Sequence, residues 1–320
     1  MLKRIFAAVF LVLVAIAGWA VLVLRDRPDL APLRAHPLAP ATSGLRVTFL
    51  GVSTLLFDDG ETAILTDGFF SRPGVLSLLR PIAPDRERIA AALERAGIAK
   101  LAAVIPVHSH YDHAMDAPEV ARRTGALLVG SESTANVGRG DGLAEDRIRV
   151  VTDGETLTFG RFRVTMILSL HFPHGMAMGE IRAPLRPPAR ASEYLDGGAY
   201  SVLIEHDGRT MLVQGSAGYV PGKLAGRAAE VVFLGIAGLG SKDAAYRDAY
   251  WKETVAAVGA KRIVPIHWDD FSRSLDEPLV GLPRLLDDLD LTIAFLGERA
   301  KAEGIEVRYA EPWTPAQPFP

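Results

Sequence analysis

The sequence of 320 residues contains no cysteine, which excludes disulfide bonds, thiolate metal ligands and a cysteine nucleophile. Neither sign of charge is in large excess, because the net charge is −3 at pH 7, and this gives no support for a nucleic-acid partner. Tandem repeats and low-complexity tracts are missing, and 49% of the residues are hydrophobic. Nothing in this composition suggests disorder, so we expect one large core held by packing alone.

The amino terminus has a long apolar run. Residues 5–24 carry no charge and follow Lys3 and Arg4, and a run of this length can span a bilayer. We predict a membrane anchor or signal segment over residues 1–24, in the form of a transmembrane helix. The positive-inside rule places the amino end in the cytoplasm. The rest of the chain would then face the periplasm of a Gram-negative cell, held by a single inner-membrane pass or released if the segment is cleaved.

A proline-rich stretch follows this run. Pro28, Pro32, Pro37 and Pro40 predict an extended, semi-rigid linker over residues 25–44. Residues 45–320 then have the size of a single large domain.

Alternating strand and helix patterns fill that domain and predict an α/β fold. A hairpin with an Asp-Gly turn is expected over residues 45–66. Strands are expected at residues 101–107, 163–170, 210–213, 262–266 and 305–309, and helices at residues 84–97, 242–258 and 291–304.

The hexapeptide His108-Ser109-His110-Tyr111-Asp112-His113 places three of the eight histidines beside an aspartate, directly after a buried strand. Imidazole and carboxylate are ligands that zinc and similar divalent ions prefer. Side chains alternate along an extended segment, so His108 and His110 can bind one ion together. Asp112 and His113 come after the chain turns towards a helix and can face a second ion. A lone histidine is more often a core or surface residue, but this density predicts a metal site.

The motif H-x-H-x-D-H after a buried strand resembles the hallmark of the metallo-β-lactamase superfamily, and the resemblance extends from about Leu45 to Tyr309. It implies a four-layer αββα sandwich with the site at one edge of the two packed sheets. It also implies that His108 and His110 share the first ion with a later histidine. Asp112 and His113 would share the second ion with a histidine near the carboxyl end.

Two strand ends supply those later histidines. His171 directly follows the strand at residues 163–170 and matches the third ligand of the first ion. His174 is the alternative ligand, or else a loop histidine or a substrate contact. His267 follows the strand at residues 262–266 and matches the last ligand of the second ion. His36 and His206 are expected to be structural or solvated.

Two further positions bear on the number of ions. The family usually has an aspartate that bridges the ions, and Ser216 stands at that position here. A neutral hydroxyl is a poorer bridge than a carboxylate, so either one or two ions are expected. Asp67 matches a family residue that supports a metal ligand by hydrogen bonding, although capping of a turn would also explain it.

The loop after these histidines carries Arg182, Arg186 and Arg190, with Tyr194 nearby. An arginine fork suits phosphate or carboxylate, so these four residues are candidates for binding an anionic substrate. A solvated surface loop is the alternative explanation.

This ligand set predicts a metal-dependent hydrolase that uses a metal-bound hydroxide on an ester, lactone or phosphodiester of a small molecule. The cofactor is expected to be one or two Zn²⁺ ions, with Mn²⁺ or Fe²⁺ as alternatives, and Asp112 is the candidate catalytic residue. A mono-iron, dioxygenase-like oxidoreductase on the same fold is the competing enzyme class. A metal-binding module without catalysis is the third hypothesis.

Overall fold

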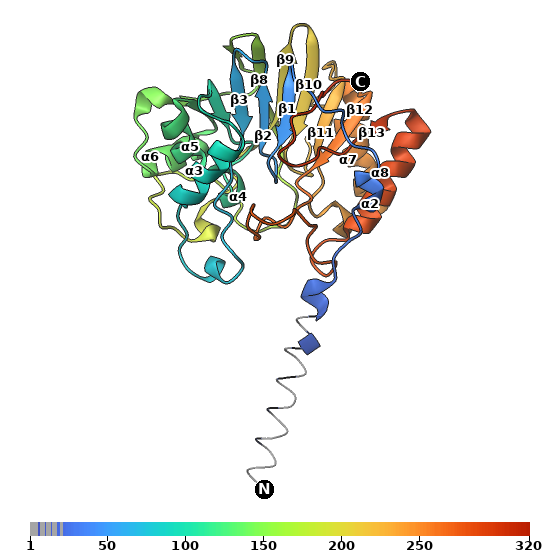
Figure 1. The fold of residues 1–320 in the computed structure, drawn as a ribbon, viewed down its shortest axis with the longest axis horizontal. Coiled ribbons are helices and arrows are strands. Elements are labelled where there is room, and N and C mark those ends of the chain that lie inside the picture. Colours follow the sequence, from blue (N-terminus) through green and yellow to red (C-terminus); the bar gives the residue numbers. More distant parts are fainter. Residues whose placement is uncertain (1–5, 7–9, 11–13, 15–17, 20–21) are drawn as a thin grey trace.

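The computed structural model describes residues 6, 10, 14, 18–19 and 22–320. Within this part of the chain, two sheets pack face to face, and helices cover the outer face of each (Figure 1). The first sheet has the strand order β1-β2-β3-β4-β5-β6 and the second β13-β12-β11-β10-β9-β8-β7. This is the four-layer αββα arrangement that the sequence predicts.

The elements of the amino-terminal half form the first sheet and its helical cover. Its strands are β1 (Arg46–Phe49), β2 (Leu55–Asp58), β3 (Ala63–Thr66), β4 (Ala103–Ile105), β5 (Leu127–Gly130) and β6 (Ile148–Val150). Its helices are α3 (Arg86–Arg95), α4 (Tyr111–Ala114), α5 (Ala117–Thr124) and α6 (Glu132–Gly140), with the 3-10 turns η1 (Ser77–Leu79) and η2 (Glu145–Arg147).

The carboxyl-terminal half forms the second sheet. Its strands are β7 (Thr156–Phe159), β8 (Phe162–Ser169), β9 (Ala199–His206), β10 (Arg209–Gln214), β11 (Val231–Gly235), β12 (Arg262–Ile266) and β13 (Glu306–Val307). The outer helices are α7 (Ala244–Thr254) and α8 (Leu289–Glu303), and the 3-10 turns are η3 (Ala191–Glu193), η4 (Leu239–Ser241) and η5 (Ala256–Val258). The strands are rich in β-branched and other apolar residues, which favour extended backbone. Asp85, Asp243 and Asp288 cap the amino ends of α3, α7 and α8.

The core lies between the sheets. Phe57 of β2 meets Phe233 of β11 edge to face, with ring centroids 5.5 Å apart, and both side chains are fully buried. Contacts of this kind between large apolar side chains supply most of the stabilisation of such a fold. They also hold the strand ends of the two sheets at fixed positions relative to each other.

Strand direction explains where a site can form. Strands β3, β4, β5 and β6 are parallel, as are β10, β11 and β12, and β8 runs in the direction of β10 because each is antiparallel to β9. Parallel strands end at the same edge of a sheet. The loops after β3, β4, β8 and β12 therefore meet at one edge of the sandwich, where the short helix α4 lies (Figure 1).

The segment after the apolar run differs from the predicted linker. Leu30, Leu33 and Leu38 are buried in the main core, and residues 31–34 form the short helix α2 (Ala31–Arg34). Pro37 bridges to Tyr309 in the manner of a strand. Residues 25–44 therefore do not form an extended spacer, because their apolar side chains pack on the carboxyl-terminal part of the domain.

The predicted transmembrane helix is contradicted. Among the residues that the structure describes, no helix is long and apolar enough to cross a membrane. Most of the run at residues 5–24 lies outside the described residues. The periplasmic location of the domain stays a prediction.

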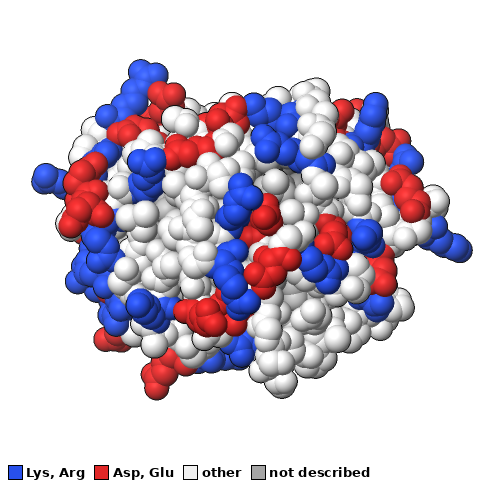
Figure 2. Space-filling view, turned by 90° about the horizontal axis from the view of Figure 1, so that it is seen from above, with Lys and Arg blue, Asp and Glu red and all other residues white. Residues whose placement is uncertain are grey.

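Surface charge is mixed. Figure 2 shows basic and acidic residues interspersed on the face seen from above, without a continuous field of either sign. Exposed charges commonly pair, as Arg209 does with Glu230 at 2.8 Å. Such pairs contribute little to stability. Because opposite charges lie side by side, no strongly charged area forms on the face shown in Figure 2.

Candidate metal centre

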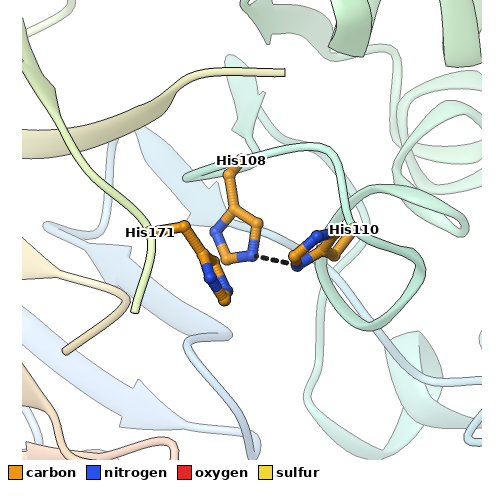
Figure 3. A group of neighbouring side chains, drawn as sticks. All are labelled: His108, His110 and His171. Atoms are coloured by element: carbon orange, nitrogen blue, oxygen red, sulfur yellow. Dashed lines mark hydrogen bonds between the residues drawn. The ribbon is translucent and has the colours of Figure 1, made fainter. Parts of the chain in front are cut away.

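Three histidines from two loops converge to form a first group. His108 and His110 follow β4 of the first sheet, and His171 follows β8 of the second (Figure 3). One ligand atom from each lies within 4.8 Å of the others. His108 Nε2 is 3.2 Å from His110 Nδ1. The packing of the sheets thus brings together the three residues that the sequence assigns to the first ion.

Backbone carbonyls set the tautomers of two of these histidines. The Nε2 atom of His110 lies 3.0 Å from the carbonyl oxygen of Ala177, and Nδ1 of His171 lies 2.7 Å from that of Phe172. A carbonyl oxygen can only accept, so each of these nitrogens is the donor. The lone pairs that remain are on Nδ1 of His110 and Nε2 of His171. Such outer hydrogen bonds are how proteins aim imidazoles at a metal.

The protonation state of this group also suits a metal. Burial is the largest cause that lowers the pKa of His171, to about 3, and the neighbouring His110 adds to the effect. Burial, followed by the neighbouring histidines, also holds the pKa of His108 well below its usual range. Both rings are neutral at physiological pH, and neutral imidazole is the form that binds divalent cations.

Asp112, His113 and His267 form a second group. The Nε2 atoms of His113 and His267 are 3.2 Å apart and lie 3.4 and 3.5 Å from Oδ2 of Asp112. Burial alone would raise the pKa of Asp112, but His113 and His267 hold it well below its usual range. Two imidazoles and an ionised carboxylate fit a divalent cation.

Asp67 connects the two loops of the first sheet. Its Oδ2 atom accepts a hydrogen bond from Nδ1 of His113 at 2.7 Å, and its Oδ1 atom accepts one from the N–H of Val107 at 2.9 Å. These bonds turn the Nε2 lone pair of His113 towards the second group. Asp67 also has a left-handed backbone, with φ of +52°, which is uncommon for a residue other than glycine.

Ser216 has a different contact from a bridging ligand. Its hydroxyl oxygen accepts the N–H of Phe172 at 2.9 Å, so it supports the loop that carries His171. Among the residues that the structure describes, neither three-residue group includes Ser216.

His174 lies beside the first group and outside it. Its ring centroid is 4.7 Å from that of His171 and 5.9 Å from that of His110. Nδ1 of His174 accepts the N–H of Met176 at 2.9 Å, and the side chain is exposed. In this arrangement His174 is a neighbour of the proposed ligands.

The four candidate substrate residues lie apart from both groups. Arg182, with 84% of its side chain exposed, pairs with Glu180 at 3.3 Å, and Arg186 and Arg190 are also exposed. Tyr194 is 1% exposed and packs in a second apolar cluster. The three arginines are exposed and the tyrosine is buried, and the anion-binding role of these residues stays a prediction.

One buried ion pair was not anticipated from the sequence. Arg72 and Asp269 are both fully buried, and Nη2 of Arg72 is 2.6 Å from Oδ2 of Asp269. Oδ1 of Asp269 accepts the N–H of Val52, whose carbonyl accepts the N–H of His267. The pair therefore holds the loop that carries His267. Asp269 lies two residues after His267, and this position could have marked it in the sequence as a residue that supports the ligand. Nothing in the sequence around Arg72 indicates its part in the ion pair.

The fold and these two groups define the class of protein. A family model described as the beta-lactamase superfamily domain matches residues 62–268, which is more than half of the chain. The protein belongs to this family, within the metallo-hydrolases of the metallo-β-lactamase fold.

Particular relatives support this assignment. A UPF0173 metal-dependent hydrolase of Heliobacterium modesticaldum is 24% identical over 256 residues, which cover 77% of this chain and 91% of the relative. The solved structure of Igni18, described as a novel metallo hydrolase from Ignicoccus hospitalis, has a TM-score of 0.53 at 17% identity and covers 85% of this chain and 97% of that one. CmlA, described as a diiron β-hydroxylase from Streptomyces venezuelae, has a TM-score of 0.50 at 14% identity and covers 84% of this chain and 53% of that one. The two solved structures show similarity of fold alone.

Proposed function

We propose that the two groups bind divalent cations, zinc foremost, and that the protein hydrolyses an ester, lactone or phosphodiester bond in a small molecule. The observation that carries this proposal is the convergence of six donor side chains in two groups. Hydrogen bonds to Ala177, Phe172 and Asp67 direct the donor nitrogens of three of the histidines. Relatives named metal-dependent hydrolases support the same reaction class.

The chemistry divides between the cation and the chain. When bound, a divalent cation would acidify a coordinated water molecule and polarise the oxygen of the bond under attack. His108, His110 and His171 would hold the first ion, and His113 and His267 the second together with Asp112. Because Asp112 is ionised and lies at the second group, it can orient the attacking water by accepting a hydrogen bond from it.

The number of carboxylates limits how tightly two ions can bind together. The described groups contain one carboxylate, Asp112, and the hydroxyl of Ser216 is already hydrogen-bonded to the backbone. Each divalent cation brings two positive charges, which carboxylates offset and hydroxyls do not. With one carboxylate for two cations and no bridging carboxylate at Ser216, we expect each bound ion to weaken the binding of the other.

The side chains beside the first group favour a substrate with an apolar part. Leu170 precedes His171, and Met176 and Met178 flank Ala177, whose carbonyl accepts the hydrogen bond of His110. All three apolar side chains are largely exposed, at 55%, 67% and 45%. Exposed apolar side chains grouped at a site are typical of ligand-binding surfaces. We infer that an uncharged substituent of the substrate lies here.

The proposal is tested by metal replacement. Protein stripped with a chelator should lose hydrolysis of chromogenic esters, lactones and phosphodiesters, and Zn²⁺ or Mn²⁺ should restore it. His110→Ala should remain inactive after metal is added, whereas His36→Ala, which changes an exposed histidine, should behave as the wild type. Full hydrolysis by metal-free protein would refute the proposal. Restoration by Fe²⁺ alone, with consumption of oxygen, would identify an oxidoreductase. Metal binding without turnover on the whole panel would support the non-catalytic module.

A further inference from the structure

A buried carboxylate near the second group is not explained by the fold. Asp287 is 4% exposed, and its Oδ2 atom accepts the N–H of Gly238 at 2.9 Å. Its Oδ1 atom is buried and has no hydrogen-bond partner. No lysine or arginine of the described residues is paired with it. The side chain therefore holds a charge-bearing oxygen that the protein leaves unsatisfied.

Such a group is unfavourable unless a cation compensates it. An unpaired buried charge costs several kcal/mol in typical proteins. Burial accordingly raises the pKa of Asp287 to about 6, while the Gly238 N–H and His267 act in the opposite direction. Among the side chains that affect it, His267 is thus the one that favours the ionised form.

His267 also has a buried polar atom without a hydrogen-bond partner. Its Nε2 atom faces the second group, 3.2 Å from Nε2 of His113, while its Nδ1 atom is buried without a partner. If Nε2 donates its lone pair to a cation, Nδ1 must carry the proton. Asp67 accepts the corresponding proton of His113. Within the described residues, His267 has no such acceptor in hydrogen-bond contact.

Asp287 is held by Gly238, whose loop lies next to the segments that carry His171 and His267. Gly238 lies in the loop after β11, and β11 is the parallel neighbour of β12, which delivers His267. Gly238 also packs against Phe172, the residue after His171, since a methyl group added to Gly238 would lie 2.8 Å from that ring. The loop that fixes Asp287 therefore packs against the side chain of Phe172, which follows His171, and lies next to the strand that carries His267.

We propose that Asp287 is a positioning carboxylate for the second metal position, acting through His267. Its negative charge stabilises the cation and the protonated Nδ1 edge of His267, and it supplies charge that Ser216 does not. This inference rests on the proposed function, because it assumes that Asp112, His113 and His267 bind a cation. It assigns Asp287 no direct contact with substrate.

The test is a Zn²⁺ titration of metal-free protein against a competing chelator, with the wild type, Asp287→Asn and Asp288→Asn. The amide introduced by Asp287→Asn keeps an oxygen for the Gly238 N–H and removes the charge. The second Zn²⁺ should bind roughly 10- to 100-fold more weakly, in the range measured for residues that support metal ligands, while the first is unchanged. Asp288→Asn is the matched control, since Asp288 caps α8 and asparagine caps equally well.

The unfolding midpoint of metal-free protein separates this role from a structural one. Asp287→Asn should not lower it, because the substitution removes an uncompensated charge. A lowered midpoint with weakened binding of both ions would show a structural role and overturn the inference, as would unchanged affinity for the second ion. Wild-type protein that binds a single Zn²⁺ and hydrolyses the panel would overturn this inference and leave the proposed function intact. Absence of any Zn²⁺ binding would overturn both.

Discussion

Asp67 offers the sharpest test of how this chain orients its metal ligands. Its carboxylate is fully buried and accepts hydrogen bonds from His113 and Val107. Asparagine has nearly the same shape, and its carbonyl oxygen can still accept the Val107 N–H. Its amide nitrogen then faces Nδ1 of His113. Two donors cannot share that contact, so the Asp67→Asn variant favours the tautomer of His113 with the proton on Nε2, which cannot bind a cation.

The magnitude follows from the bond that is lost. A hydrogen bond to a charged group contributes about 1.5–3 kcal/mol, which corresponds to a roughly 10- to 100-fold weaker second ion at about 1.4 kcal/mol for each factor of ten. Although burial opposes the charged form, Asp67 and Asp112 raise the pKa of His113. The variant also loses that electrostatic contribution. The first ion should change far less, because its three proposed ligands make no hydrogen bond to Asp67.

The assay is the competitive Zn²⁺ titration, together with kcat/KM on the best chromogenic substrate. Asp58→Asn is the control, since Asp58 forms a partly exposed pair with Arg46 and such pairs contribute about 0–1 kcal/mol. An affinity for the second ion within about twofold of the wild type, by the arithmetic above, would refute the orientation argument. Equal weakening of both ions would show that Asp67 acts on the loop as a whole.

Three further outcomes are expected. His110→Ala should remove the first ion and lower kcat/KM by at least about 100-fold, and wild-type Zn²⁺ content in the purified variant, determined by elemental analysis, would contradict this. Asp269→Asn should destabilise the protein by about 3–5 kcal/mol, because it leaves the buried Arg72 without its partner, and a loss below about 1 kcal/mol in urea unfolding would argue against it. Asp59 tests acid stability: burial opposes its ionisation, but backbone N–H groups and His206 lower its pKa to about 2. A lowered folded pKa stabilises the protein above the unfolded pKa and is lost as pH falls, so the difference in unfolding free energy between wild type and Asp59→Asn should shrink from about pH 5 to about pH 2. A constant difference would contradict it.

Much of the fold could be predicted because its signals are local. The apolar run before His108 forms β4, and the capped amphipathic pattern after Asp85 forms α3. These patterns place polar residues directly after strands. Because parallel strands end at the same edge of a sheet, such residues are expected to meet there. The candidate ligands of both groups were predicted from the motif and from its resemblance to the metallo-β-lactamase superfamily, which directed attention to the strand-end histidines His171 and His267.

Local composition was a weaker guide elsewhere. Three arginines among prolines suggested an anion site; the arginines are exposed and Tyr194 is buried, and the anion site stays a prediction. Prolines suggested an extended linker, yet Leu33 and its neighbours pack on the domain. Composition cannot reveal where a loop side chain points, because distant segments provide its surroundings.

The hexapeptide, with its strand-to-loop context, determined from the sequence alone which donor side chains gather after β4, since residue type and spacing are properties of the chain itself. Only the tertiary structure decided which nitrogen of each histidine faces its group. It also decided that His171, and not His174, belongs to the first group. It also revealed the Arg72–Asp269 pair, whose members are 197 residues apart, and the unsatisfied oxygen of Asp287. The physical reason is that hydrogen bonding and burial between sequence-distant segments depend on how the two sheets pack.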